Sequence, residues 1–242
     1  MILLNVIKGV DHVADLEQLR AEFGHLNGKR RGRLDVSVFD GQDDDQLTAA
    51  LACPARVYLD ADCTAFTLSP AAFELRVTTA TAKRLDLAMC FTRFLATRFP
   101  HMAKVTDQIR HALQEAVANA VIHGNLGLNS ALRGSLASLR VFAATMEQRL
   151  SQPAYARRPL TIGARAQREG VSVSVEDCGA GFDPGSVKPS SNPAAGGMGL
   201  SIMRGCSRTM VHSRDGRRVT MTFSQDGQAP GAALYHDIVA GR

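Results

Sequence analysis

The chain has 242 residues, 45% of them hydrophobic and 21% charged, with a net charge of +5. This composition is typical of a globular protein with ample material for a core, and no apolar run approaches the length of a membrane-spanning helix. The charge is modest and aromatic residues for base stacking are few, so we expect neither a nucleic acid nor a membrane as a partner. The opening residues lack the basic leader and long apolar stretch of a signal peptide. Five scattered cysteines without a CxxC pair are typical of reduced thiols, so a cytoplasmic location is expected.

Residues 1–70 alternate weakly between apolar and polar positions and predict a small α/β unit, to which the sequence assigns no function. Strands are expected at 2–7, 34–39, 56–60 and 65–68, and helices near 12–23 and 44–52. Asp60 ends the third strand, as a phospho-acceptor aspartate would. The first strand is not followed by paired acids, however, and the segment is too short for five strand–helix units, so Asp60 is interpreted as a turn residue. Ser69 and Pro70 mark the boundary with the next unit.

Residues 72–224 carry a stronger pattern and predict a second unit, followed by a tail at 225–242. A strand at 73–78 precedes a helix at about 81–98, and a central helix begins near Ala103, after Pro100. Gly124 is expected to end that helix in the left-handed conformation. The remaining expected elements are a helix at 131–150, strands at 160–166 and 171–176, a mobile flap at 184–196, a helix from 196 to about 212 and a strand at 219–223.

Two polar residues on the central helix are candidates for chemistry. Glu115 and Asn119 lie one turn apart, at the edge of the apolar stripe of this helix. A carboxylate in this place could activate a nucleophile, and an amide could hold a hydrated cation. The alternative is a solvated helix face without chemistry, and this stretch alone leaves the two interpretations open.

Two glycine motifs further along the chain favour the first interpretation. The strand at 171–176 runs into Asp177-Cys-Gly179-Ala-Gly181, which places an acceptor at the wall of a pocket with backbone packed closely behind it. The sequence Gly197-Met-Gly199-Leu200 then opens a helix, where unpaired amide groups and the helix dipole favour an anion.

The order of the three motifs resembles the ATP-binding superfamily that includes gyrase, a class of heat-shock chaperones, histidine kinases and MutL. Within it, EAVANAVIHGN and GGMGLSIM are most similar to the anti-sigma-factor serine kinases of bacterial partner-switching systems. The resemblance covers about residues 72–224 and implies a two-layer α/β sandwich, the Bergerat-type ATP-binding fold, with a mixed sheet and helices on one face. The matching boxes are Glu115-x3-Asn119-x3-His123-Gly124, Asp177-x-Gly179-x-Gly181 and Gly197-x-Gly199-Leu200.

The resemblance also implies a role for each matching residue. Asn119 would hold the Mg²⁺ that bridges the phosphates of ATP, and Glu115 would be the general base. Asp177 would accept a hydrogen bond from the adenine amino group. His123 and Gly124 are expected to close the helix rather than to touch the ligand. The glycines of the second box, Gly179 and Gly181, would shape the adenine pocket, and Gly197, Gly199 and Leu200 would face the phosphates.

Two departures from the family pattern leave the efficiency of phosphotransfer open. Many relatives carry a Gly-Thr pair before the last strand, whereas Gly216 is followed here by Arg217. Several kinases of this type carry a basic residue just before the third box, whereas residues 194–196 are Ala-Ala-Gly and Lys188 is the only cation of the flap.

The expected function is that of an ATP-binding serine-protein kinase and anti-sigma-type regulator. It would phosphorylate a small antagonist protein and exchange partners with a sigma factor or a similar effector; a homodimer is compatible with this interpretation. One alternative is a nucleotide-binding interaction module without catalysis. Another is the catalytic domain of a histidine kinase, against which no helical hairpin with a phospho-acceptor histidine is expected before residue 72.

Overall fold

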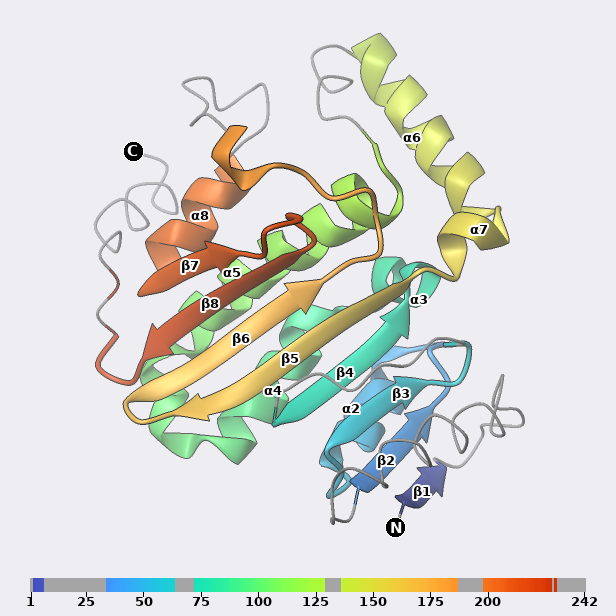
Figure 1. The fold of residues 1–242 in the computed structure, drawn as a ribbon. Helices are drawn as coiled ribbons and strands as arrows, with labels where there is room; N and C mark the ends of the chain where they lie inside the picture. Colours follow the sequence, from blue (N-terminus) through green and yellow to red (C-terminus); the bar gives the residue numbers. More distant parts are fainter. Residues whose placement is uncertain are drawn as a thin grey trace.

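The computed structural model describes residues 2–6, 34–63, 72–128, 136–186, 198–227 and 229. Figure 1 shows the arrangement of its elements. The strands are β1 (Ile2–Val6), β2 (Leu34–Phe39), β3 (Val57–Asp60), β4 (Phe73–Thr78), β5 (Pro159–Gln167), β6 (Gly170–Glu176), β7 (Thr209–His212) and β8 (Arg218–Ser224). The α-helices are α2 (Asp44–Ala52), α3 (Thr79–Arg84), α4 (Leu87–Arg98), α5 (Thr106–Asn119), α6 (Leu136–Leu150), α7 (Pro153–Ala156) and α8 (Met198–Cys206). Two 3-10 helices, η1 (Pro100–Val105) and η4 (Pro184–Ser186), and a π-helical turn, η2 (Ala120–Asn125), lie between them.

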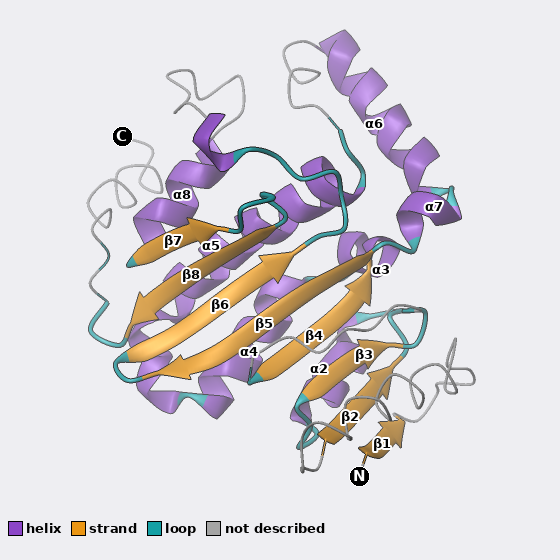
Figure 2. Ribbon diagram, viewed as in Figure 1, coloured by secondary structure: helices purple, strands orange, loops and turns teal. Residues whose placement is uncertain are grey.

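The described strands form one sheet of eight, in the order β1-β2-β3-β4-β5-β6-β8-β7. Pairing is parallel from β1 to β4 and antiparallel from β4 to β7. Helices α2, α4, α5 and α8 cover one face of this sheet (Figure 2). The predicted two-layer α/β sandwich with a mixed sheet is therefore confirmed.

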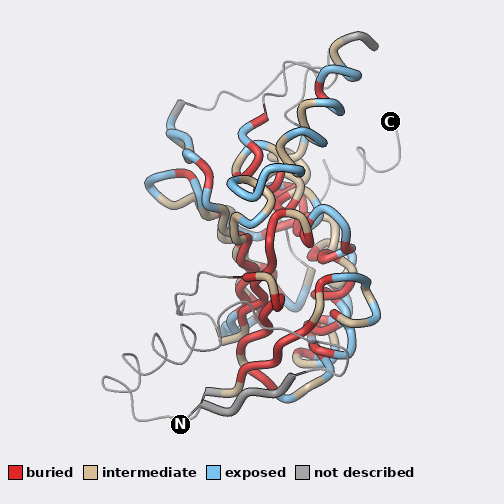
Figure 3. The backbone as a smooth tube through the Cα atoms, turned by 90° about the vertical axis from the view of Figure 1, so that its right-hand side faces the viewer, coloured by how far each residue is buried: buried red, intermediate tan, exposed pale blue. Residues whose placement is uncertain are grey.

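The core fills the space between the sheet and the helical layer, as the buried segments in Figure 3 show. Strand β6 illustrates why the sequence folds in this way: its valines are fully buried, whereas Ser172 and Ser174 between them are not. This alternation turns one side of the strand toward the helices. Residues that meet in the core include Leu75, Val77, Ile162, Val173, Val175 and Met221 from the sheet and Phe91, Leu95, Ile109 and Leu113 from the helices.

The N-terminal strands extend the same sheet, because β3 pairs in parallel with β4. Asp60 ends β3 and is buried. Its carboxylate accepts hydrogen bonds from the backbone N–H groups of Asp62 and Thr78, both at 3.1 Å, and Thr78 is the N-cap of α3. Burial raises the pKa of Asp60 above its ordinary value. The carboxylate thus holds the turn after β3, the role that the sequence predicted, and also the start of α3, which the sequence did not predict. The division between residues 1–70 and 72–224 stays a prediction.

Two helix boundaries differ from the expected ones. The helix expected at 81–98 is split, because the side chain of Asp86 accepts a hydrogen bond from the N–H of Met89 at 2.9 Å and so begins a new helix, α4. The central helix begins at Thr106 rather than near Ala103, since Pro100 opens a 3-10 helix that precedes it.

The prediction that Gly124 ends the central helix in the left-handed conformation is wrong. The helix continues past Asn119 through the π-helical turn η2 to Asn125, and Gly127, with a φ of 61°, is the residue in the left-handed region. Gly124 is required for a different reason, its close approach to Asp177, which is described with the site.

The helix expected from 196 to about 212 is also too long. Helix α8 ends at Cys206, and Thr209–His212 form β7, which pairs antiparallel with β8. The turn between the two strands contains Gly216, whose φ of 72° suits a tight hairpin. The β-branched residues Thr209 and Val211 pair with residues of β8. The local sequence pattern does not show this pairing, because β8 lies later in the chain.

Some expectations fall on residues outside the described ranges. These are the helix at 12–23, the strand at 65–68, the first residues of the helix at 131–150 and most of the flap at 184–196. Across the ranges that are described, no helix combines the length and the apolar character needed to cross a membrane. All five cysteines are described and all are free thiols, as predicted.

Candidate nucleotide-binding site

The first and third boxes meet where α5 packs against the start of α8. A Cβ atom placed on Gly199 would lie 2.6 Å from Oε2 of Glu115 and 3.4 Å from Nδ2 of Asn119. Both polar side chains are half-buried, and they project from the edge of a helix whose inner face is fully apolar. Glycine at position 199 therefore allows the backbone of α8 to approach the carboxylate and the amide directly.

Of the other two residues of the third box, the structure describes Leu200 but not Gly197. Gly197 lies outside the described residues, and α8 begins at Met198. The side chain of Leu200 is half-buried and packs against the core. Its backbone N–H belongs to the first turn of α8, where amide groups lack partners within the helix and favour an anion.

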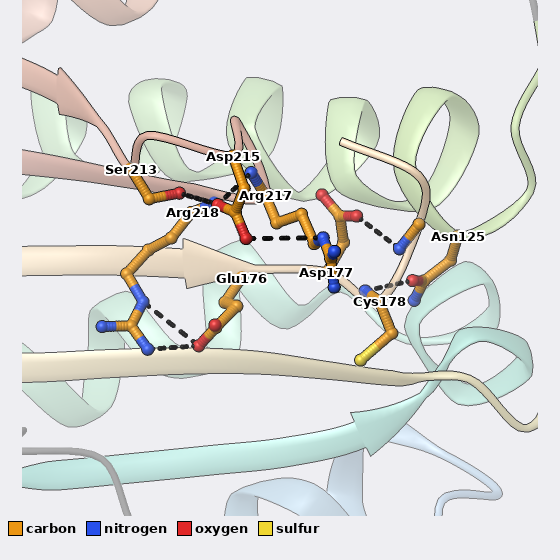
Figure 4. A network of polar contacts seen from close by, with 9 residues as sticks. Asn125, Glu176, Asp177, Cys178, Ser213, Asp215, Arg217 and Arg218 are labelled. Carbon is orange, nitrogen blue, oxygen red and sulfur yellow. Dashed lines mark hydrogen bonds and ion pairs between the residues drawn. The ribbon is translucent and has the colours of Figure 1, made fainter. Parts of the chain in front are cut away.

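The second box lies at the C-terminal end of the same helix, where η2 follows Asn119. Asp177 follows β6 (Figure 4) and is half-buried. Its Oδ1 atom accepts a hydrogen bond from the N–H of Gly179 at 2.8 Å. A Cβ on Gly124 would lie 2.3 Å from Cγ of Asp177, so that only glycine permits this approach. Among the residues that the structure describes, Oδ2 of Asp177 accepts no hydrogen bond, which leaves it available to a ligand.

The environment of Asp177 favours its neutral form more than water does. Burial raises the pKa of Asp177 above its ordinary value, and it outweighs the hydrogen bond from Gly179 and the positive charge of Arg217, which both lower the pKa. The backbone N–H of Asp177 donates to the carbonyl of Arg217 at 3.0 Å, so this arginine stands directly beside the aspartate. Arg217 therefore places a positive charge beside this carboxylate.

The glycines of the second box allow two close backbone contacts. A Cβ on Gly179 would lie 2.2 Å from the carbonyl oxygen of Gly124. Gly181 has a φ of 76°, and a Cβ there would lie 2.1 Å from the carbonyl oxygen of Asp215. The loop after β6 therefore rests on the helix end on one side and on the β7–β8 hairpin on the other, and the N–H of Phe182 donates to the carbonyl of Asp215 at 3.1 Å.

His123 contacts the backbone of the loop that follows η2. Its Nδ1 atom lies 2.6 Å from the carbonyl oxygen of Leu128, and the side chain is otherwise exposed. The histidine thus holds the loop that follows η2.

Sequence reasoning missed Asn125, the last residue of η2. Its side chain is fully buried, and its Oδ1 atom accepts a hydrogen bond from the N–H of Cys178 at 2.7 Å. Its carbonyl oxygen accepts a hydrogen bond from Arg158 at 2.7 Å, and Arg149 donates to the next carbonyl, that of Leu126. The sequence signal that could have identified Asn125 is its position as a polar residue directly after His123 and Gly124, near the end of a helix.

The residues of this site fit adenine and a metal-bound triphosphate. Asp177 offers an acceptor beside Gly124 and Gly179, and the amide of Asn119 makes no hydrogen bond to any described residue. No group of three or more His, Cys, Asp or Glu side chains in the described ranges could hold a metal by itself. Mg²⁺ often takes one or two protein ligands and completes its shell with phosphate oxygens and water. Asn119 alone would suffice as the protein ligand of such a metal.

Substitution of Gly124 by alanine is expected to weaken ATP binding by about tenfold or more, because the new methyl group must displace the Asp177 carboxylate. The unfolding temperature should also fall by several degrees, roughly as for other overpacked sites. Calorimetry and thermal unfolding measure the two effects. Gly185→Ala is a matched control, since a Cβ there meets only the exposed side chain of Asp183 at 3.3 Å. Wild-type affinity in Gly124→Ala would contradict the described pocket.

Comparison with protein families agrees with this geometry. The profile of the histidine kinase-like ATPase domain matches residues 78–223, which is more than half of the chain and includes all three boxes. Comparison with curated proteins gives no significant match. The matched region carries the two-layer fold, the Glu115–Asn119 helix and the Asp177 pocket, and on this evidence the chain belongs to the family of histidine kinase-like ATPase domains, which bind ATP.

Proposed function

We propose that the chain is a serine-protein kinase that uses ATP and Mg²⁺ to phosphorylate a small antagonist protein, and that it exchanges this partner for a sigma factor or a similar effector. The observation that carries the proposal is the placement of Glu115, one turn before Asn119 and against the first turn of α8. A carboxylate beside the expected phosphate position is suited to accept a proton from a serine hydroxyl. The five free thiols support a cytoplasmic site of action.

The proposed roles are those that the family resemblance implies, and the positions of the residues are compatible with them. Asp177 would accept a hydrogen bond from the adenine amino group, and the amide groups at the start of α8 would bind phosphate oxygens. Asn119 would hold the metal, which supplies positive charge to the phosphates. Glu115 would take the proton of the serine hydroxyl as the serine oxygen bonds to the terminal phosphorus and the bond from that phosphorus to ADP breaks.

The thiol of Cys206 is buried, and its charge couples to that of Glu115. Burial, together with the negative charge of Glu115, raises the pKa of Cys206 to about 12. This cysteine is therefore a neutral side chain at neutral pH and is a poor nucleophile.

The alternative from another class is a nucleotide-dependent interaction module that binds partners without phosphorylating them. It needs the Asp177 pocket but not Glu115. The histidine-kinase alternative has less support, because β1, β2, α2 and β3, the described elements before β4, form strands of the shared sheet and a covering helix.

The test uses the full chain, Mg²⁺-ATP and a candidate antagonist, chosen as a small single-domain protein from the genes that neighbour its own. We expect a phosphoserine on that protein, located by mass spectrometry, and weaker binding of the phosphorylated form to the kinase. Tight binding without any phosphoserine at saturating ATP would favour the interaction module. If ATP caused neither heat of binding nor thermal stabilisation, the nucleotide roles assigned above would be wrong.

A further inference from the structure

We propose that Asn125 is a positioning residue for adenine recognition, which fixes the orientation of the Asp177 carboxylate through the peptide that follows it. The inference rests on ATP binding by this domain and is independent of phosphotransfer. Asn125 does not face the pocket itself and acts through Asp177.

The side chain of Asn125 uses both of its functional groups in a fully buried position. Its Oδ1 atom accepts from the N–H of Cys178 at 2.7 Å, and its Nδ2 group donates to Oγ1 of Thr79 at 2.9 Å and to the carbonyl of Pro159 at 3.1 Å. Only an amide supplies an acceptor and two donors in this volume. The residue therefore joins the helix end to three segments that are distant in sequence.

The hydrogen bond from Cys178 to Asn125 is one of three that fix the backbone around Asp177. The N–H of Cys178 donates to Asn125 (Figure 4). The N–H of Asp177 donates to the carbonyl of Arg217, and the N–H of Gly179 donates to Oδ1 of Asp177. Three successive amide groups are thus engaged, which fixes how the carboxylate is rotated and leaves Oδ2 for the ligand. Without Asn125 the central bond is lost, and the peptide on which the Asp177–Gly179 contact depends can rotate.

Asn125 also sets the distance between the two ends of the site. It closes the same continuous helix, α5 and η2, that carries Glu115 and Asn119. The phosphate end and the adenine end of the site are therefore held by one rigid element. Loss of the Asn125 side chain leaves the phosphate end in place and affects the adenine end, so base selectivity is the property that should change.

Selectivity is measured with inosine triphosphate, which carries an oxygen where ATP carries its amino group. The wild-type chain should prefer ATP, because Asp177 accepts from that amino group. In Asn125→Leu we expect the ratio of ATP affinity to inosine triphosphate affinity to fall roughly tenfold, the value of one lost hydrogen bond. Affinity for inosine triphosphate should change little. Calorimetry with both nucleotides on the full chain gives the ratio.

A second variant keeps the test valid if Asn125→Leu does not fold. Thr79→Val preserves the shape of the side chain and removes one acceptor of the Asn125 amide, and it should change the ratio in the same direction by a smaller factor. An unchanged ratio in the folded variants, or an equal loss for both nucleotides, overturns the positioning role. A wild-type chain that binds neither nucleotide refutes ATP binding itself, whereas a normal ATP preference without any phosphotransfer refutes only the proposed kinase function.

Discussion

Substitution of Glu115 by glutamine is expected to slow phosphotransfer by about a thousandfold, the usual contribution of a general base, while ATP affinity stays close to that of the wild type. Glutamine keeps the size of the side chain beside Gly199 but cannot accept the proton of a serine hydroxyl. Because Glu115 is placed as a base and not as a ligand of the nucleotide, binding and transfer should separate. Single-turnover transfer to the antagonist protein and calorimetry with ATP measure the two quantities.

Gln114→Ala is the matched control for this experiment. Gln114 precedes Glu115 on the same helix and is exposed, so its loss should leave both quantities unchanged. Transfer at the wild-type rate in Glu115→Gln would show that another group accepts the proton. Loss of ATP binding in the same variant would instead give Glu115 a direct role in holding the nucleotide.

Substitution of Asp177 by asparagine is expected to weaken ATP binding by between roughly tenfold and a hundredfold, since a charge-assisted hydrogen bond is lost. The variant retains the shape of the residue and its position against Gly124. Affinity for inosine triphosphate should fall much less, because that nucleotide offers no amino group. Equal losses for both nucleotides would argue against Asp177 as the acceptor of the adenine amino group.

The same substitution should change how the stability of the free protein depends on pH. Burial raises the folded-state pKa of Asp177 above the ordinary value of 3.8, which describes the unfolded chain. Between these two values the folded state binds more protons than the unfolded state, so the free energy of unfolding decreases as the pH rises through the window. Asp177→Asn removes this decrease and should make the free protein at least as stable as the wild type at neutral pH.

Thermal unfolding of the free protein at several pH values above 3.8 tests whether its stability decreases as the pH rises. Glu176→Gln serves as the control, because Glu176 accepts a hydrogen bond from Nε of Arg218 at 3.1 Å on the partly exposed neighbouring position. Glu176→Gln removes a carboxylate next to Asp177 in the chain, but one that is paired with an arginine. A stability decrease of the same size in Asp177→Asn and Glu176→Gln at neutral pH would contradict the cost assigned to the buried aspartate.

Residue patterns within single helices and strands were sufficient to predict many of the secondary-structure elements of this protein. The alternation in β6, the apolar stripe of α5 and the one-turn spacing of Glu115 and Asn119 are local, because the strand period and the helix period are set by the backbone itself. The order of the three boxes then gave the fold, and β4 begins and ends where the sequence indicated. The family match confirms the ATP-binding domain without reference to any tertiary contact.

Only the tertiary structure decided which of these residues approach each other. Gly124 was expected to be a helix end, and its actual requirement is the Asp177 carboxylate, 53 residues later in a different element. Residues 209–212 form a strand because β8 offers hydrogen-bond partners, and Asn125 is buried because Thr79, Pro159 and Cys178 surround it. Sequence periodicity reports the environment of a residue along its own element, whereas each of these features depends on atoms brought together by chain segments far apart in sequence.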